Sequence, residues 1–233
     1  MSESIQHVID NRKISRICHF TPARNFREML SGKTGILNTS ALRDDEKALF
    51  TQTDAQRYDG KLNHICATIE YPNMYYFHKA QQAEVYFKEW VVLLISTKHL
   101  INEQTWFCAN NAALGRGQNL IQGDAGFASM FSDVVSGSSG NSYRRSPKHL
   151  ICCPTDAQAE VLIFDHIPLS DIIGVVYPSE EAAHLDFVRH QMLGLDYVCP
   201  PRIISPDFFE RTNTWRNITQ GIKPNETFWT HDE

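Results

Sequence analysis

The sequence predicts a single domain, spanning residues 1–233, of the α+β class. Strand-like segments outnumber helical ones and are short runs rich in Ile, Val and aromatic residues. Two clear helical patterns occur, one near the N-terminus and one late in the chain. Of the 233 residues, 42% are hydrophobic and 21% are charged, which is enough apolar material for a substantial core. We therefore expect a mostly antiparallel sheet region with an early and a late helix packed beside it.

The first predicted elements are a short strand and the helix that follows it. Arg16–Phe20 has the composition of a strand, and Thr21 and Pro22 are typical of the N-cap and the first position of a helix. Gly32 is placed to end this helix as its C-cap. The apolar face, at i, i+3 and i+4 spacing, consists of Phe26, Met29 and Leu30.

Further strands and one late helix complete the predicted fold. The expected strands are the apolar runs His64–Tyr71, Trp90–Ser96, Thr105–Ala109, His149–Cys153, Glu160–Phe164 and Ile172–Tyr177. The late helix begins at Ser179, carries Glu180 and Glu181 in its first turn, and ends at Gly194. Its predicted apolar face consists of Leu185, Val188 and Met192.

Two segments lack a clear helix or strand pattern. Residues 136–148 begin with a Ser- and Gly-rich stretch, which predicts a mobile loop, and continue with the basic run Tyr143–Lys148. That run is either a local nucleic-acid contact or a solvated linker. The C-terminal segment, residues 213–233, contains Trp215 and Trp229 among Thr and Asn, so it is either an ordered cap over the core or an interaction tail.

Composition excludes several classes of protein. A net charge of −5 argues against a general nucleic-acid coating protein. The N-terminus lacks a signal-peptide pattern and no apolar run approaches the roughly 18 residues of a membrane span, so we expect a cytoplasmic protein. The six cysteines show no C-x-x-C spacing, and we expect buried free thiols and no structural metal. For the adjacent pair Cys152 and Cys153, strand alternation predicts one thiol on each face, which favours core packing over a redox switch.

The segment Gln158-Ala159-Glu160, which opens a predicted strand, is the most informative stretch of the chain. Side chains two residues apart on a strand share a face, so Gln158 and Glu160 present a carboxamide and a carboxylate to one pocket, roughly 7 Å apart. The alternative is a solvated glutamate at the edge of a sheet, because charged side chains are usually exposed.

The order of several motifs resembles the NAD site of ADP-ribosyltransferases. His19-Phe20-Thr21 ends a first strand and is followed by a helix, and Gln158-Ala159-Glu160 opens a much later strand. Within that superfamily the chain is most similar to the DarT toxins, which attach ADP-ribose to bases of single-stranded DNA. The matching segments, between about residues 14 and 202, are His19-x-Thr21 with Asn25, Pro72-Asn73-Met74-Tyr75-Tyr76, Trp106-Phe107 before Asn111-Ala112-Ala113, and Gln158-Ala159-Glu160-Val161-Leu162. The resemblance implies an ADP-ribosyltransferase-like fold with a split, mostly antiparallel sheet flanked by helices, and NAD as co-substrate without a metal.

Two residues are expected to carry the chemistry. Cleavage of the nicotinamide–ribose bond builds positive charge on the ribose, so a fixed carboxylate beside that ring stabilises the transition state more than the ground state. The resemblance implies that Glu160 is this catalytic carboxylate. The DarT family also carries an arginine that supports catalysis, and Arg57 matches it in chain order. Arg43 is a rival for that role, and a surface arginine is the alternative.

Other residues are expected to bind the two substrates. We expect contacts to NAD from His19, Thr21, Asn25 and Tyr75, and contacts to the acceptor from Gln158, Asn111, Arg144 and Arg145. His19 would donate a hydrogen bond to a ribose hydroxyl, although an interior histidine is often only a satisfied polar group. Tyr75 and its neighbour Tyr76 offer faces for nicotinamide or a splayed base, or pack in the core.

The resemblance leaves the acceptor and the biological role as expectations. The Pro72-Asn73 form and Asn111-Ala112-Ala113 favour guanine over thymine as the modified base. Similarity to DarT implies a toxin paired with a cognate antitoxin of the ADP-ribosylglycohydrolase type. No membrane association is expected, because the chain lacks a long apolar run. The alternatives are a transferase acting on protein or RNA, and a non-catalytic NAD or nucleotide sensor.

Overall fold

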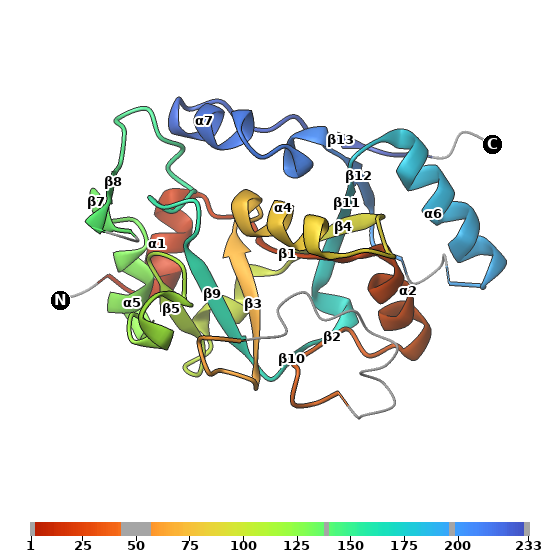
Figure 1. Ribbon diagram of the computed structural model, residues 1–233, viewed down its shortest axis with the longest axis horizontal. Helices are drawn as coiled ribbons and strands as arrows, with labels where there is room; N and C mark the ends of the chain where they lie inside the picture. Colours follow the sequence, from red (N-terminus) through yellow and green to blue (C-terminus); the bar gives the residue numbers. More distant parts are fainter. Residues whose placement is uncertain (1–2, 43–56, 138–139, 196–198, 231–233) are drawn as a thin grey trace.

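A computed structural model of the protein describes residues 3–42, 57–137, 140–195 and 199–230. It confirms the α+β class. A nine-stranded sheet, with helices around it, has the strand order β13-β12-β11-β4-β1-β3-β9-β5-β6 (Figure 1). Among the described residues of this sheet, β11 and β12 are the only parallel neighbours.

The strands of this sheet are β1 (Ile17–Pro22), β3 (His64–Ile69), β4 (Trp90–Ile95), β5 (Trp106–Cys108), β6 (Ile121–Gln122), β9 (Glu160–Phe164), β11 (Ile172–Tyr177), β12 (Arg202–Ile204) and β13 (Thr227–Phe228). Two small pairs are made by β2 (Ile36–Leu37) with β10 (His166–Ile167) and by β7 (Val134–Ser136) with β8 (Ser142–Arg144). The α-helices are α1 (Ile5–Arg12), α2 (Ala23–Gly32), α4 (Met74–Ala83), α5 (Gly123–Ser129), α6 (Glu180–Met192) and α7 (Asn213–Thr219).

The large sheet is split between β1 and β3. Strand β1 pairs with β4 along its whole length, and every residue of β4 is buried. In contrast, β1 pairs with β3 at only two positions, Ile17 with Ile69 and Cys18 with Thr68. The rest of β1 therefore lies beside β3 without a backbone ladder. This is the split that the resemblance implied, and it begins next to His19.

Helix α2 follows β1 as predicted, but both caps differ. Its buried face contains Phe26, Met29 and Leu30 as expected. Strand β1 extends through Pro22, which occupies the N-cap position without a side-chain hydrogen bond. Thr21 remains in the strand, where it pairs with Val91 of β4, and its hydroxyl accepts from the Asn25 amide at 3.0 Å. At the other end Lys33, at φ 53°, takes the left-handed position predicted for Gly32.

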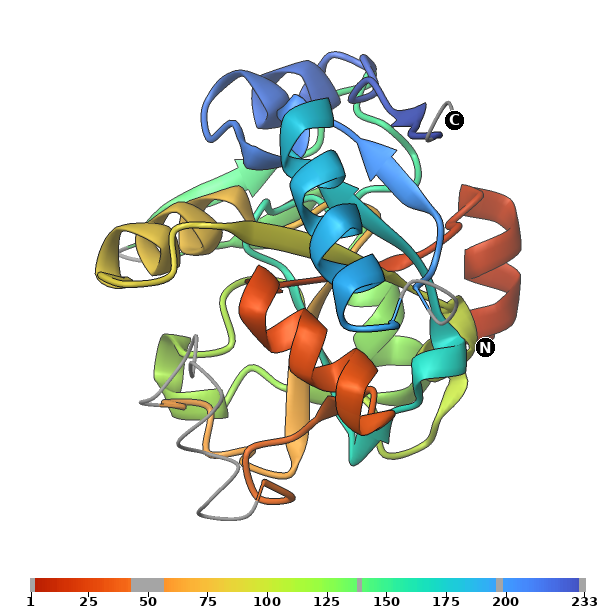
Figure 2. The same ribbon diagram turned by 90° about the vertical axis from the view of Figure 1, so that its right-hand side faces the viewer.

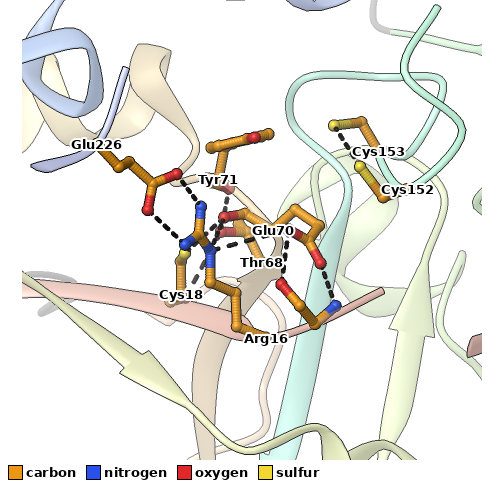
Figure 3. A network of polar contacts seen from close by, with 9 residues as sticks. Arg16, Cys18, Thr68, Glu70, Tyr71, Cys152, Cys153 and Glu226 are labelled. Atoms are coloured by element: carbon orange, nitrogen blue, oxygen red, sulfur yellow. Dashed lines mark hydrogen bonds and ion pairs between the residues drawn. The ribbon is translucent and has the colours of Figure 1, made fainter. Parts of the chain in front are cut away.

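Residues 149–153 form a turn and not the predicted strand. The guanidinium group of Arg145 donates to the carbonyl oxygens of Leu150 and Cys153, at 2.7 and 2.8 Å, so the backbone curls around it. The thiols of Cys152 and Cys153 consequently lie together, with 3.9 Å between the sulfur atoms, where strand alternation predicted opposite faces (Figure 3). Both side chains are buried, and all six cysteines are free thiols.

Helix α6 begins at the predicted N-cap, since the Ser179 hydroxyl accepts from the amide of Ala182. The prediction of its buried face is wrong, because Leu185, Val188 and Met192 are exposed. The inward side chains are Ala183, Asp186, Phe187 and His190. The Tyr177 hydroxyl donates to Asp186 at 2.5 Å, so a polar pair takes part of the interface expected to be apolar. Figure 2 shows α6 beside α2, where Arg27 pairs with Asp186 at 3.4 Å.

The C-terminal segment is an ordered part of the fold through residue 230. Helix α7 is followed by β13, which pairs with β12 at the edge of the sheet. Glu226, just before β13, accepts two hydrogen bonds from the guanidinium of Arg16, each 2.6 Å long (Figure 3). Arg16 also donates to the backbone carbonyl of Glu70. The buried Glu70 carboxyl accepts from the amide and the hydroxyl of Ser15. Residues 213–230 thus contact both the edge of the sheet and Arg16.

No helix within residues 3–42, 57–137, 140–195 and 199–230 is long and apolar enough to cross a membrane.

Candidate active site

Glu160 is the first residue of β9 and lies where this strand emerges from the core. Its side chain is half-buried, whereas Val161, Leu162 and Ile163 are fully buried. Cys108 of β5 is its neighbour across the ladder. The amide of Ala112, in the turn after β5, donates to Glu160 Oε2 at 3.1 Å. The carboxylate is therefore held by a backbone donor, which orients it without neutralising its charge.

Asp156 fixes the turn that leads into this strand. Its carboxylate accepts from the amide of Gln158 at 2.9 Å, and its backbone carbonyl accepts from the amide of Ala159. The side chain is buried, and burial raises the pKa of Asp156 to about 6. Asp156 therefore sets the backbone path of Gln158 and Glu160, a role that the sequence analysis did not assign.

Burial of Asp156 predicts a stability that falls as pH rises. The folded protein binds this proton more tightly than the unfolded chain, whose carboxyl has a pKa of 3.8. Between these values the folded state therefore loses stability with rising pH, by about 2 to 3 kcal/mol in all. The Asp156→Asn variant keeps an acceptor for Gln158 but not the charge. We measure the unfolding free energy in urea, and expect the value for Asp156→Asn minus that for wild type to increase from about pH 4 to pH 7. A value that does not change with pH would contradict the raised pKa of Asp156.

His19 bridges the split of the sheet. The backbone carbonyl of Cys66 in β3 lies 2.8 Å from His19 Nδ1, so this nitrogen carries the proton. Burial lowers the pKa of His19, which keeps the ring neutral and makes Nε2 a hydrogen-bond acceptor. In this tautomer the free ring nitrogen accepts hydrogen bonds, whereas the sequence analysis expected His19 to donate; its contact to NAD stays a prediction.

Thr21 and Asn25 lie next to His19 and are bonded to each other. Both side chains are buried, and the Asn25 amide donates to the Thr21 hydroxyl across the junction of β1 and α2. They fix the backbone that carries His19. Their predicted contacts to NAD stay predictions.

Helix α4 covers the end of β1 and was not predicted. Phe77 stacks on Phe20 with 4.6 Å between ring centroids, and the Tyr76 ring lies 6.0 Å from Phe20. Asn73 caps the helix by accepting from the amide of Tyr76. Tyr75, in contrast, points outward and is 40% exposed. The two adjacent tyrosines of α4 therefore have different surroundings: the Tyr76 ring packs near β1, and Tyr75 faces solvent.

Arg57 lies in the segment that precedes β3 and forms a buried ion pair. Nε and Nη2 of its guanidinium donate to the two carboxylate oxygens of Asp59, both at 3.1 Å. Nη1 donates to the carbonyl oxygen of His64 at 2.7 Å. These bonds give Arg57 a structural role that the sequence did not reveal, and its catalytic role stays a prediction. Its rival Arg43 lies outside the described residues.

The two roles of Arg57 predict different results for Arg57→Lys. Lysine keeps the charge but cannot form the paired bonds to Asp59, so we expect the unfolding free energy to fall by about 2 kcal/mol. Asp59→Asn is the matched control, because it disrupts the same pair without removing the arginine. If Arg57 also acts in catalysis, Arg57→Lys will slow transfer at a temperature where both variants are folded, and Asp59→Asn will not. Equal transfer rates for Arg57→Lys and Asp59→Asn would show that Arg57 has only the structural role.

The predicted acceptor-binding residues differ in their availability. Asn111 lies in the turn that holds Glu160, and its side chain accepts from the amide of Ala113. Arg144, in β8, is exposed, whereas Arg145 is bonded to the carbonyls of the 149–153 turn. Of the two arginines, Arg144 is therefore the one that faces solvent. Asn110, which sequence reasoning missed, ties the turn after β5 to the carbonyl of Ser136 in β7.

Backbone pairing places Glu160 at the start of β9 beside Cys108 at the end of β5, and His19 of β1 bonds β3, the strand next to β9. Within the described residues no group of three or more His, Cys, Asp or Glu side chains could hold a metal ion.

Comparisons with known proteins identify what this arrangement is similar to. Residues 18–194 match the family model described as "ssDNA thymidine ADP-ribosyltransferase, DarT". No curated protein matches the chain. Among solved structures, Thermus sp. 2.9 DarT in complex with NAD+ is 13% identical with a TM-score of 0.57, over 85% of this chain and 98% of that one. Thermus sp. 2.9 DarT in complex with ADP-ribosylated ssDNA is 11% identical with a TM-score of 0.57, over 90% and 100%. Thermosipho africanus DarTG in complex with ADP-ribose is 12% identical with a TM-score of 0.51, over 84% and 51%. At these identities, the structural likeness concerns the fold.

Proposed function

The chain belongs to the DarT family of single-stranded DNA ADP-ribosyltransferases, and from this premise we propose that Glu160 is the catalytic carboxylate of its NAD-dependent transfer reaction. The observation that carries the proposal is the position of this carboxylate. It is held by the Ala112 amide at the first residue of β9, and β9 is the neighbour of β3, the strand that His19 of β1 contacts. The solved Thermus sp. 2.9 DarT complexes with NAD+ and with ADP-ribosylated ssDNA support the same substrates for this fold.

The reaction exchanges one bond at the ribose. The bond between nicotinamide and the ribose carbon breaks, and nicotinamide leaves with the bonding electrons. An atom of the acceptor base forms the new bond to the same carbon, and the base releases a proton. Glu160 would stabilise the positive charge on the ribose between these events. His19 would orient the ribose by accepting from a hydroxyl through Nε2.

The acceptor base and the biological role complete the proposal. We propose guanine as the base, from the Pro72-Asn73 and Asn111-Ala112-Ala113 segments, while the matching family model is described for thymidine. We further propose a toxin that is paired with an antitoxin of the ADP-ribosylglycohydrolase type. The similarity to Thermosipho africanus DarTG supports a paired system.

The test is mass spectrometry of acceptors incubated with NAD and the protein. Single-stranded oligonucleotides that each lack one base type, duplex DNA, RNA and a protein lysate are compared. An adduct on single-stranded DNA that is lost only when guanine is absent supports the full proposal, and loss without thymine reassigns the base. Adducts only on RNA or protein would overturn the acceptor assignment. NAD binding without nicotinamide release on any acceptor would indicate a sensor.

A further inference from the structure

Arg211 and Tyr75 form an exposed pair beside the candidate active site. The Arg211 guanidinium carbon lies 5.4 Å from the centroid of the Tyr75 ring, in the first turn of α4. Arg211 is exposed, in the connection between the short helix Pro206–Phe209 and α7. The carboxylate of Glu210 accepts from the amides of Thr212, Asn213 and Thr214, which fixes the backbone next to Arg211. The Arg211 guanidinium thus faces solvent from a backbone segment that hydrogen bonds hold in place.

Tyr143 of β8 lies on the other side of the start of β9 from Tyr75. In Figure 1 the start of β9 lies between the β7–β8 hairpin and the first turn of α4. Burial raises the pKa of Tyr143, and Asp156 and Tyr75 in its neighbourhood add to this rise. Its ring also packs on the hairpin, because a Cβ atom at Gly137 would lie only 2.4 Å from Tyr143 Cε2. A side chain that is 36% exposed is therefore held in place.

These residues have the chemistry of a single-stranded nucleic-acid contact. Aromatic rings stack on bases of any type, and an arginine beside them neutralises a backbone phosphate and adds a cation–π contribution. Resting on the proposed function, we propose that Tyr75, Tyr143 and Arg211 bind the nucleotide next to the acceptor base. The two rings contact its base and Arg211 contacts its phosphate. Tyr75 is thereby assigned to DNA and not to NAD, consistent with its neighbour Tyr76 being the residue that lies on β1.

The proposal predicts a specific weakening of DNA recognition. We expect Tyr143→Ala and Arg211→Met each to raise the KM for DNA about 5- to 100-fold, with little change in kcat at saturating DNA. Tyr143→Phe keeps the ring and should restore the KM. Arg211→Met should also lower the salt dependence of DNA binding by about one phosphate contact. Tyr86→Ala and Arg216→Met are matched controls, because both residues are exposed and lie outside this group.

The experiment measures transfer and binding on one labelled single-stranded oligonucleotide of mixed sequence, then on versions trimmed by one nucleotide at a time from each end. Wild type should lose affinity when the nucleotide next to the acceptor is removed, and Tyr143→Ala should not show that loss. Thermal unfolding confirms that each variant is folded. Transfer to DNA with KM values equal to those of the control variants would overturn this inference alone. Absence of any DNA adduct in wild type would instead overturn the proposed function.

Discussion

Glu160→Gln is expected to reduce ADP-ribose transfer by at least about 100- to 1,000-fold, the usual loss when a preorganised group that stabilises transition-state charge is removed. The amide oxygen of glutamine can still accept from Ala112, so the turn after β5 should keep its position. The substitution therefore removes the charge and leaves the geometry. The rate is measured in single turnover by nicotinamide release and by DNA adduct.

Glu89→Gln is the matched control for this prediction. Glu89 is an exposed carboxylate paired with Arg189 on α6, far along the chain from β9. We expect it to transfer ADP-ribose at the wild-type rate. The melting temperature of Glu160→Gln should stay close to that of wild type, because Glu160 is only half-buried. A Glu160→Gln rate within fivefold of wild type would show that the charge is supplied elsewhere.

Arg16→Met is expected to cause the largest loss of stability, about 3 to 5 kcal/mol in unfolding free energy. Arg16 forms paired bonds with Glu226, and it also faces the buried carboxyl of Glu70 at 3.8 Å (Figure 3). Its removal leaves two carboxylates without their cation in a region of low exposure. Their charges raise the pKa of Arg16 despite the opposing effect of burial, so the arginine stays ionised throughout the accessible pH range.

Two comparisons separate this charge effect from the loss of packing. Glu226→Gln keeps an acceptor for Arg16 and should cost less than Arg16→Met, about 1 to 3 kcal/mol. Arg144→Met removes an exposed arginine and should stay within about 0.5 kcal/mol of wild type. All are measured by urea unfolding at neutral pH. If Arg16→Met were no more destabilising than Arg144→Met, the ion pair with Glu226 would be dispensable.

The sequence predicted the elements whose apolar pattern is continuous and local. Strand β9 has the predicted bounds, and Ser179 is the N-cap of α6 as expected. Helix α4 was missed because its aromatic residues were interpreted as ligand contacts, although Met74, Phe77 and Ala80 supply a buried helical face. Periodicity could have found that helix.

Other differences arise from partners that are remote in the chain. The inward face of α6 contains Asp186 because Tyr177 and Arg27 satisfy its carboxylate, and no local pattern shows this. Arg145 curls residues 149–153 into a turn for the same kind of reason. In the site, sequence reasoning named Glu160 but not the Ala112 amide that holds it, because a backbone donor carries no side-chain signal.

The ion pair between Arg16 and Glu226 joins residues that are 210 positions apart. Closing so long a loop is an entropic cost that is offset only when the contacts around it form together. During synthesis Arg16 is made long before its partner, so the nascent chain holds β1 without this bond. The edge strand β13 follows Glu226 directly and pairs with the same half of the sheet. The ion pair and the β12–β13 ladder can thus form only after translation has passed β13, so these late residues complete the half of the sheet that β1 begins.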